Sequence, residues 1–459
     1  MTANAEKKHT IDMCNGPILK KMLLFAVPLM FSSMLQLLFN AADVAVVGNF
    51  AGDNSLAAVG STSSIINLLT NFFLGLSIGA NVLVARYFGA KQEKDIHETV
   101  HTAMLLSVIS GIIMTIVGCL AAKQVLTWMD TPPEVIDLSV LYLRIYFCGT
   151  TANMVYNFGS AILRAVGDTK RPLYYLTFAG VVNVALNLLF VIVFKMDVAG
   201  VALATCISQC ISAVLVVICL CREQGMIKLE LRKLHVYKKK FAMILRIGFP
   251  ASLQSIIFSF SNNIIQASVN GFGNLVVAGN SAAANLEGFV YVSMNSFYQA
   301  SLSFTSQNMG ASQNDRIPKI LLKAEICVIT VGLVMGNLLL MFGEPLLRIY
   351  TDNPLVVEAG MKRLGVISRM YCLCGMMDVA VGTLRGLGYS VLPMVVSLIG
   401  ACGLRLLWIF TFFKLEQFHS TTSLYMTYPV SWLLTFFAHM ICFAIISKNV
   451  LGRLKNEKV

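Results

Sequence analysis

The segment ARYFGAKQEKDI, residues 85–96, returns in altered form as SQNMGASQNDRI, residues 306–317. The two segments share Gly-Ala, Gln and Ile at matching places, and each matched pair lies 221 residues apart. The same spacing relates a second set of residues, in which Pro133, Leu163-Arg164, Gly167 and Pro172 match Pro354, Leu384-Arg385, Gly388 and Pro393. Separate coincidences would not share one spacing, so we predict an internal duplication.

The composition places both halves of the chain in a membrane. Hydrophobic residues make up 57% of the chain, charged residues make up 13%, and the mean hydropathy is +0.73. A water-soluble chain of this length would not have these values. A membrane-spanning helix needs about 20 mostly apolar residues. Six such stretches are present in each half, centred near Met34, Leu69, Ile109, Thr151, Val184, Ile211, Phe258, Val290, Val334, Cys372, Leu404 and Phe437.

We therefore predict an all-α polytopic membrane protein, with twelve transmembrane helices in two pseudo-symmetric six-helix lobes. An even number of helices restores the direction of the chain, so the halves are expected to be parallel repeats, a form that is common among transporters. The basic segment at residues 222–240 is predicted to be a cytoplasmic linker. It separates an N-lobe, residues 1–225 with helices 1–6, from a C-lobe, residues 226–459 with helices 7–12. Because the halves already form a pair, a monomer suffices.

The distribution of lysine and arginine predicts the orientation. Counted from a cytoplasmic N-terminus, the inner segments hold most of the 35 Lys and Arg residues. The outer segments hold few, namely Lys123, Lys195, Arg348 and Lys414, with Lys362 and Arg363 beside them. Translocation of positive residues is disfavoured, so both termini are predicted to be cytoplasmic, with the chain in the inner (plasma) membrane. The net charge of +12 follows largely from this asymmetry, and no basic face on a soluble module indicates nucleic-acid binding.

An intramembrane enzyme is the alternative from another functional class. HETVH, residues 97–101, matches the pattern of zinc proteases. However, it begins a predicted span at the membrane interface, and the sequence offers no third ligand nearby. The 12 cysteines lie mostly within predicted spans and lack the spacing of a zinc site, which favours a packing role. We therefore predict that the protein is not an enzyme and needs no metal or cofactor.

Four charged residues fall inside predicted spans: Asp43, Glu287, Asp378 and Arg405. A charge in the middle of a membrane costs about 2.5–3.5 kcal/mol on insertion scales, so it usually faces a cavity or a partner. Asp43 follows Gln36 and Asn40 at helical spacing, which makes one face of the first span polar. Pro28, two turns before Gln36, permits a bend in the same helix.

A second group of polar residues falls in the fifth and sixth spans. Asn183 and Asn187 are four residues apart and share a helix face, and Thr205 lies in the next span. Together with Asp43, these residues offer the hard oxygen ligands that a small cation prefers. Asparagine and threonine also simply bond membrane helices together, at roughly 0.6 kcal/mol each. The spacing leaves both interpretations open.

Methionine, aromatic and amide side chains supply candidates for a substrate-binding surface. Such side chains form adaptable surfaces that accept planar molecules, with cation–π attraction for positively charged ones. The same residue types also fill lipid-facing helices, which is the more common role of any single one. The candidates are Met154, Asn157, Gln254, Asn262, Tyr291 and Met294.

The chain resembles the multidrug and toxic compound extrusion (MATE) family, and within it the DinF-type prokaryotic branch of the MOP flippase superfamily. The resemblance covers nearly the whole chain. It is carried by FAVPLMFSSMLQLLFNAADVAVVGNFAG, LAAVGS, ARYFGAKQEKDI, ILRAVGDTKRP, NVALNLLF and VAGVALAT in the first half, and by AAANLEGFV, SQNMGASQNDRI and LRGLGYSVLP in the second.

This resemblance implies a V-shaped antiporter whose two lobes enclose a central cleft. Members export small organic compounds, often cationic and aromatic, in exchange for inward H⁺ or Na⁺. The family's ion-linked carboxylate, asparagine and threonine match Asp43, Asn183 and Thr205. The family often has a second acid one turn after that asparagine, where this chain has Asn187. The site therefore holds one formal negative charge, and a two-carboxylate site cannot be carried over.

The resemblance is less specific for the second half of the chain. Glu287 lies in a pattern of the branch, and Asp378 lies in the tenth span, where some relatives outside the branch carry an acid. The alternative to a functional role is a structural ion pair between Glu287 and Arg405, or separate pairing of each with helix ends. The rival function is a flippase for a lipid-linked precursor or another amphiphile. The count of twelve spans and the few intramembrane arginines argue against it.

Overall fold

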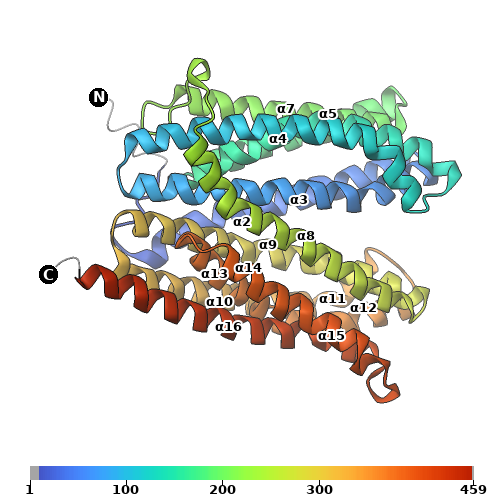
Figure 1. The fold of residues 1–459 in the computed structure, drawn as a ribbon. Helices are drawn as coiled ribbons and strands as arrows, with labels where there is room; N and C mark the ends of the chain where they lie inside the picture. The colour runs from blue at the N-terminus through green and yellow to red at the C-terminus, as the bar shows by residue number, and fades with distance from the viewer. Residues whose placement is uncertain (1–9, 457–459) are drawn as a thin grey trace. The chain divides into compact units, whose positions relative to one another are not determined.

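The computed structural model describes residues 10–456, and this part of the chain is built of helices without a β-strand (Figure 1). The first half contains α2 (Ile18–Phe50), α3 (Asp53–Gly89), α4 (Glu93–Trp128), α5 (Pro133–Ala165), α6 (Lys170–Leu188) with the π-helical η1 (Leu189–Val193), and α7 (Asp197–Arg222). The second half contains α8 (Lys238–Asn270), α9 (Asn274–Gly310), α10 (Ile317–Met341), α11 (Gly343–Arg348), α12 (Pro354–Ile367), α13 (Cys372–Gly386), α14 (Val391–Ser397), the π-helical η5 (Leu398–Gly403), α15 (Leu404–Phe410) and α16 (Thr421–Asn456). The 3₁₀ turns are η2 (Leu231–Lys233), η3 (Asn314–Arg316), η4 (Ser368–Met370), η6 (Phe412–Lys414) and η7 (Glu416–Phe418).

All twelve stretches predicted to span the membrane are helical. Within the described residues, ten helices are long and apolar enough to cross a membrane, and the pair Pro354–Met370 and Cys372–Gly386, bent by 45°, supplies an eleventh span. The remaining predicted span is α9, a continuous helix of 37 residues that is not among the apolar ones. Its buried positions include a series of hydroxyl groups on Ser293, Ser296, Ser301, Ser303, Thr305 and Ser306.

The internal duplication is visible in the backbone of the turns. Three pairs of residues 221 positions apart adopt left-handed backbone conformations: Gly52 with Gly273 (φ 85° and 92°), Lys91 with Ser312 (φ 56° for both), and Gly167 with Gly388 (φ 92° and 96°). L-residues other than glycine visit this region only as single residues in turns. The two halves therefore turn in the same way at matching points, in agreement with the duplication inferred from sequence.

The chain forms two compact units. Among the described residues, unit 1 comprises residues 10–12 and Phe31–Ser252. Unit 2 comprises Met13–Met30 and residues 253–456. The chain thus passes from one unit to the other inside α2 and inside α8, in each case two residues after a proline, Pro28 or Pro250. The predicted linker and the first half of α8 belong to unit 1.

Each unit is packed around one central helix. In unit 1, α5 packs against α3, α4 and α7, and Gly118 of α4 lies directly against the ring of Phe147. In unit 2, α9 packs against α10, α12 and α13. Because α9 packs against other helices, some of its hydroxyl groups bond within the protein, as Ser301 does with Thr383 at 2.6 Å between the two oxygens, whereas the buried Thr305 Oγ1 has no partner among the described residues. A central position therefore explains how a helix this polar is tolerated.

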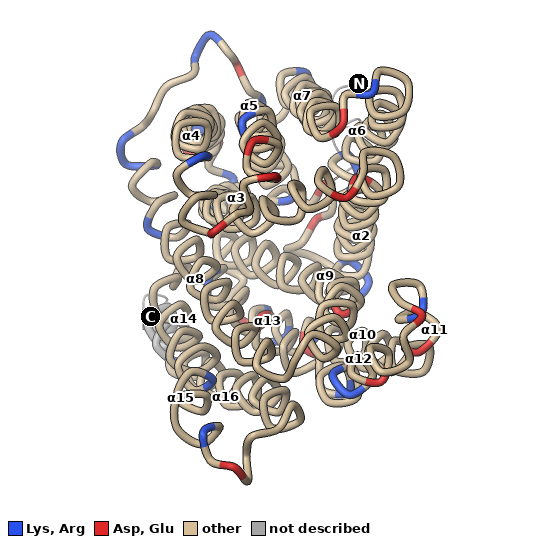
Figure 2. The backbone as a smooth tube through the Cα atoms, turned by 90° about the vertical axis from the view of Figure 1, so that its right-hand side faces the viewer, with Lys and Arg blue, Asp and Glu red and all other residues tan. Residues whose placement is uncertain are grey.

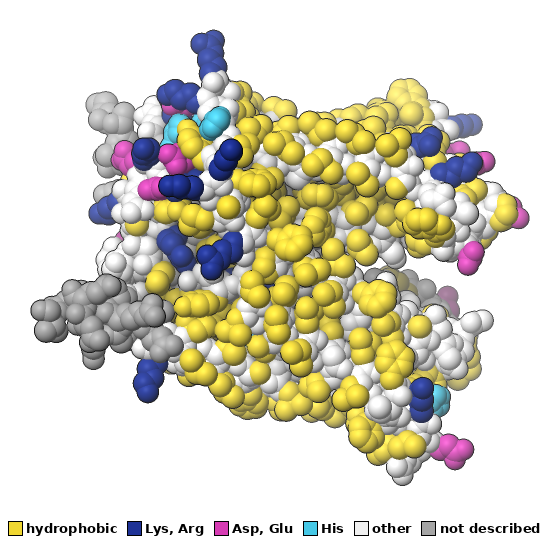
Figure 3. All heavy atoms as spheres, in the orientation of Figure 1, with side chains coloured by type: hydrophobic (Ala, Val, Ile, Leu, Met, Phe, Trp, Pro, Cys, Tyr) yellow, Lys and Arg dark blue, Asp and Glu magenta, His cyan; other side chains and the backbone are white. Residues whose placement is uncertain are grey.

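The surface has the distribution expected of a membrane protein. Figure 3 shows apolar side chains covering the visible flank of the helices, with charged side chains gathered toward the helix ends. Figure 2 shows the same for the backbone, where acidic and basic positions are sparse along the helices and frequent in the connections. Large apolar side chains that are more than half exposed include Ile116, Leu120, Val193, Ile399, Leu407 and Ile441.

Candidate functional site

The polar residues predicted in the first, fifth and sixth spans come together in unit 1. Asn187 Nδ2 donates to Asp43 Oδ1 at 2.5 Å, and Thr205 Oγ1 lies 3.5 Å from Asp43 Oδ2. Asn187 Nδ2 also lies 3.3 Å from Asn183 Oδ1, and Asn183 Nδ2 lies 3.4 Å from Thr205 Oγ1. These four residues on α2, α6 and α7 form one hydrogen-bonded cluster, which we call the Asp43 cluster.

Local packing brings the three helices to this point. Phe39, one turn before Asp43 on α2, packs its ring directly over Gly180 of α6, where a larger residue would not fit. Asn183 and Asn187 follow on the same face of α6 and are 4% and 0% exposed. Helices α2 and α7 also share a buried apolar cluster with α5, which includes Val46, Val47, Tyr142, Val198, Val201 and Ala202.

The Asp43 carboxyl has neutral partners only. Among the described residues, no lysine or arginine forms an ion pair with it, and its hydrogen-bond donors are an amide and a hydroxyl. The Asn187 Oδ1 atom is buried and accepts no hydrogen bond. The cluster thus offers oxygen atoms around a carboxyl group whose charge is not balanced by a fixed cation. Such an arrangement suits a proton or a small monovalent cation.

Gln36, Asn40 and Pro28 do not join this cluster. Gln36 and Asn40 are exposed, and neither takes part in its hydrogen bonds. Pro28 lies inside α2, which continues as a helix on both sides of it. Of the three polar residues predicted on one face of α2, only Asp43 forms hydrogen bonds with α6 and α7 among the described residues.

Glu287 pairs with a residue that the sequence did not single out. Arg363 of α12 donates to both carboxylate oxygens of Glu287, at 3.1 Å from Nε and 2.7 Å from Nη2, and to Asn280 Oδ1 at 2.7 Å. Glu287 and Arg363 are 3% and 8% exposed. Arg363 was expected beside the outer segments, and the suggested pair of Glu287 with Arg405 is wrong. Glu287 and Arg363 are 76 positions apart, and no local sequence pattern links them.

Arg405 is held by different groups. Its Nε donates to Ser431 Oγ at 2.7 Å, and its guanidinium lies 4.3 Å from the ring centre of Tyr428 and 5.5 Å from that of Trp432. No ion pair involving Arg405 is present among the described residues. Cation–π contacts therefore stabilise this buried arginine in place of a carboxylate.

Asp378 forms no contact with Glu287 or Arg405 in the described hydrogen bonds and ion pairs. It lies on α13 near Arg385, with which it interacts electrostatically. Arg385 is 5% exposed and donates to Tyr298 Oη and Gln254 Oε1, each at 2.7 Å. Glu287, Asp378 and Arg405, which we predicted to form a polar site of the second half, thus show no hydrogen bond or ion pair to one another among the described residues, although the ring of Tyr428 lies against the guanidinium groups of both Arg363 and Arg405. Arg385 belongs to the repeated Leu-Arg pair, which is the signal that could have indicated its importance.

The predicted substrate residues divide into two groups. Met154 and Met294 are 0% and 1% exposed, so they pack in the interior of their units, and Gln254 is occupied by Arg385. Asn262 and Tyr291 are exposed, and Asn157 is partly buried and donates to Asn153. The exposed residues remain predictions for substrate contact.

The HETVH motif holds the linker. The rings of His97 and His101 stack at 3.9 Å, His101 Nδ1 bonds the backbone oxygen of His97, and His101 Nε2 accepts from the backbone N–H of Glu230 at 3.0 Å. The backbone N–H of Tyr237 donates to Thr102. Both ring nitrogens of His101 are therefore occupied, and the described residues contain no cluster of three potential metal ligands.

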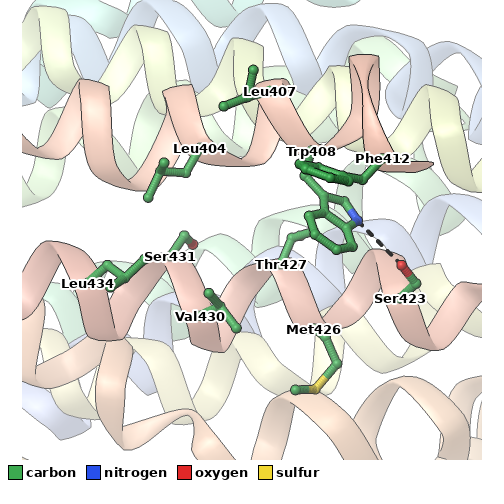
Figure 4. Close-up of a pocket in the computed structure, with 10 residues that line it drawn as sticks. All are labelled: Leu404, Leu407, Trp408, Phe412, Ser423, Met426, Thr427, Val430, Ser431 and Leu434. Atoms are coloured by element: carbon green, nitrogen blue, oxygen red, sulfur yellow. Dashed lines mark hydrogen bonds between the residues drawn. The ribbon is translucent and has the colours of Figure 1, made fainter. Parts of the chain in front are cut away.

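Unit 2 also contains an apolar cavity of about 240 Å³ between α15 and α16 (Figure 4). The figure shows Trp408 at one end, where its Nε1 donates to Ser423 at 3.3 Å. The other lining residues are Leu404, Leu407, Phe412, Met426, Thr427, Val430, Ser431 and Leu434. The cavity holds none of the residues predicted from sequence to bind substrate.

A duplicated helical bundle, with a carboxyl group embedded among its spans, defines a multi-pass membrane transporter. The MatE family model matches residues 28–189 and, a second time, residues 250–411. The chain therefore belongs to the MatE family of membrane transporters, as its sequence motifs indicated, and the two matches confirm the duplication.

Similar proteins include the probable multidrug resistance protein YpnP of Bacillus subtilis (strain 168), which is 29% identical over 394 residues, 86% of this chain and 88% of that protein. The probable multidrug resistance protein NorM of Thermotoga maritima is 24% identical over 403 residues, 85% of this chain and 84% of that protein. A solved structure, the outward-facing conformation of a multidrug resistance MATE family transporter of the MOP superfamily, has a TM-score of 0.88 at 19% identity and covers 96% of this chain and 99% of that one. The all-helical membrane fold is thereby confirmed.

Proposed function

We propose that the protein is a secondary active antiporter that exports small organic compounds, often cationic and aromatic, in exchange for inward H⁺ or Na⁺. Family membership and the multidrug resistance names of YpnP and NorM support the substrate class. The observation that carries ion coupling is the Asp43 cluster, in which one membrane-embedded carboxyl meets only neutral donors. An uncompensated carboxylate at this depth is costly, and binding a cation removes that cost.

The hydrogen bonds of the cluster suggest how binding changes the helices. A protonated Asp43 gains one O–H donor, and the cluster offers two acceptors for it: Thr205 Oγ1, which lies 3.5 Å from Asp43 Oδ2, and the buried Asn187 Oδ1, which accepts no hydrogen bond from a described residue. A sodium ion would instead take oxygen ligands from Asp43, Asn183, Asn187 and Thr205. Either event rearranges the bonds that join α2 to α6 and α7. We propose that α2 responds by bending near Pro28 during alternating access of the two units.

The single negative charge of the cluster sets a scale for coupling. Asn187 stands where relatives often have a second acid, so the site neutralises with one monovalent cation. Moving one positive charge inward across 100 mV yields about 2.3 kcal/mol. That energy supports a gradient of about 50-fold in the exported compound.

In unit 2, we propose a supporting polar role for Glu287, Asp378 and Arg405. The bidentate pair of Glu287 with Arg363 favours a structural role for that carboxylate, because its charge is already balanced. Exposed Asn262 and Tyr291 remain the best candidates for substrate contact. The lysine and arginine distribution supports cytoplasmic termini in the plasma membrane, and the internal pair of repeats supports a monomer.

The test is efflux of a fluorescent organic cation from proteoliposomes, with a proton gradient or a sodium gradient imposed separately. We expect Asp43→Asn to abolish gradient-driven efflux, and the effective gradient identifies the ion. Asp137→Asn, the same change at an exposed position of α5, serves as the matched control. Full efflux by Asp43→Asn would refute ion coupling through this cluster, and transport of a lipid-linked compound without either gradient would favour a flippase.

A further inference from the structure

Unit 2 contains a buried carboxyl group that has no role in the ion coupling proposed for the Asp43 cluster. Glu325 lies on α10, nine residues into the helix counting from Ile317, and is 7% exposed. Both of its carboxyl oxygens are buried, and neither accepts a hydrogen bond from any described residue. Sequence patterns alone do not single out Glu325, because this residue directly follows the basic, predicted cytoplasmic segment with Lys319 and Lys323.

The packing of α10 turns Glu325 toward the interior of unit 2. One turn further along, the side chain of Val328 fills the space above Gly375 of α13, and Gly332 lies against Cys372 of α13 and the sulfur of Met294 on α9. Ala324, Glu325 and Val328 are all buried. Glu325 therefore sits on the face of α10 that is packed against the other helices of the unit.

No described ionisable group forms an ion pair with Glu325, whose side chain is buried. The elements packed against α10 carry charged and titratable side chains, none of which forms an ion pair or hydrogen bond with Glu325 among the described contacts. They include Glu287, Tyr291 and Tyr298 on α9, Asp315 and Arg316 on η3, Glu344 and Arg348 on α11, Glu358, Lys362 and Arg363 on α12, Arg369 on η4, and Asp378 and Arg385 on α13. A buried ion without a partner costs several kcal/mol, whereas the neutral acid costs far less.

We propose that Glu325 is a second proton-binding residue of the transporter, separate from the Asp43 cluster, and that it carries one proton inward during the transport cycle. The step is a protonation followed by an ionisation: the carboxylate takes a proton from water in the outward-open state, and in the inward-open state the O–H bond breaks and the proton passes to cytoplasmic water. The neighbouring helix α9, against which α10 packs, carries buried hydroxyl groups. This proposal rests on the proposed antiport.

The first measurement is the infrared carbonyl band of protonated carboxylic acids in the reconstituted full-length protein. We expect Glu325→Gln to remove the contribution of one acid, and Glu325→Asp to shift that band while keeping it. Glu358→Gln is the matched control, since Glu358 is exposed and paired with Lys362 on α12. A spectrum unchanged by Glu325→Gln would mean that Glu325 is ionised and would overturn the proposal.

The second measurement is the number of protons that enter per molecule exported, followed with a pH-sensitive dye in proteoliposomes. We expect Glu325→Gln to export with one proton fewer per molecule and Glu358→Gln to match the wild type. An unchanged proton count in Glu325→Gln would show an acid that never exchanges, which also overturns the proposal. If the proposed ion coupling through Asp43 were wrong, efflux would persist in Asp43→Asn, and that result is independent of the one for Glu325→Gln.

Discussion

Replacement of Arg363 by methionine is expected to destabilise unit 2 strongly. Arg363 donates two hydrogen bonds to Glu287 and one to Asn280, and both members of the ion pair are almost fully buried. Methionine retains much of the volume of arginine but supplies no donor. The change therefore leaves the Glu287 carboxylate buried without a partner, while the packing around it is largely preserved.

The expected loss is about 3–5 kcal/mol, the usual cost of removing one member of a buried ion pair. A loss of about 3 kcal/mol changes the unfolding equilibrium constant roughly 150-fold. Removing both charges together, in Arg363→Met with Glu287→Leu, leaves no unpaired ion and should recover most of this stability. Arg405→Met, by contrast, should couple less strongly to Glu287→Leu, because no hydrogen bond or ion pair joins Glu287 to Arg405 among the described residues, and only Tyr428 lies between Arg405 and Arg363.

The assay is unfolding of the purified protein in mixed detergent micelles, with the single and double variants compared in two double-mutant cycles. We expect a large coupling free energy between Glu287 and Arg363, and a clearly smaller one between Glu287 and Arg405. A double variant as unstable as the sum of its single changes, or strong coupling of Glu287 to Arg405, would refute the pairing.

Three further outcomes are expected from the same structure. Asn187→Asp places a second carboxyl in the Asp43 cluster, so efflux measured against external pH should shift, because two neighbouring carboxylates resist ionising together. His101→Ala removes the acceptor for the Glu230 backbone N–H, so hydrogen exchange at that amide should accelerate while amides in the middle of α5 are unchanged. Gly382→Ala brings a Cβ to 2.8 Å from a backbone oxygen of α9 and should cost about 1–3 kcal/mol in the unfolding assay, whereas Gly365→Ala, with open space around it, should be nearly neutral.

The sequence was most informative about features that are local. Each predicted span is a helix, because about 20 apolar residues have no other way to satisfy their backbone within a bilayer. The repeated Gly-Ala-x-Gln segments form matching turns, since Lys91 and Ser312 adopt the same left-handed backbone. Asp43, Asn183, Asn187 and Thr205 lie together in the structure. Their spacing alone left a structural role open, and the role in ion coupling that the family resemblance implies stays a prediction.

Long-range pairings were the features that local patterns did not reveal. Arg363, the partner of Glu287, lies 76 residues further along the chain. The zinc-protease pattern at His97–His101 contacts the linker through a hydrogen bond from the Glu230 backbone to His101. The alternative of an ion pair between Glu287 and Arg405 is wrong, because the partner of each residue depends on the rotation of its helix against neighbours that are distant in sequence. Helical spacing predicts which residues share a face, but it does not say which face of another helix lies opposite.

By itself, then, the amino-acid sequence determined that this protein is a duplicated, all-helical membrane protein, because hydropathy and turn chemistry act over short stretches of chain, and its motifs indicated the transporter family through their resemblance to known members. Only the tertiary structure decided how the buried charges are balanced. Asp43 meets neutral donors, Glu287 meets Arg363, and Glu325 meets no partner among the described residues. The physical reason is that the cost of a charge inside a membrane depends on the atoms within a few ångströms of it, and helix packing brings those atoms from distant parts of the chain.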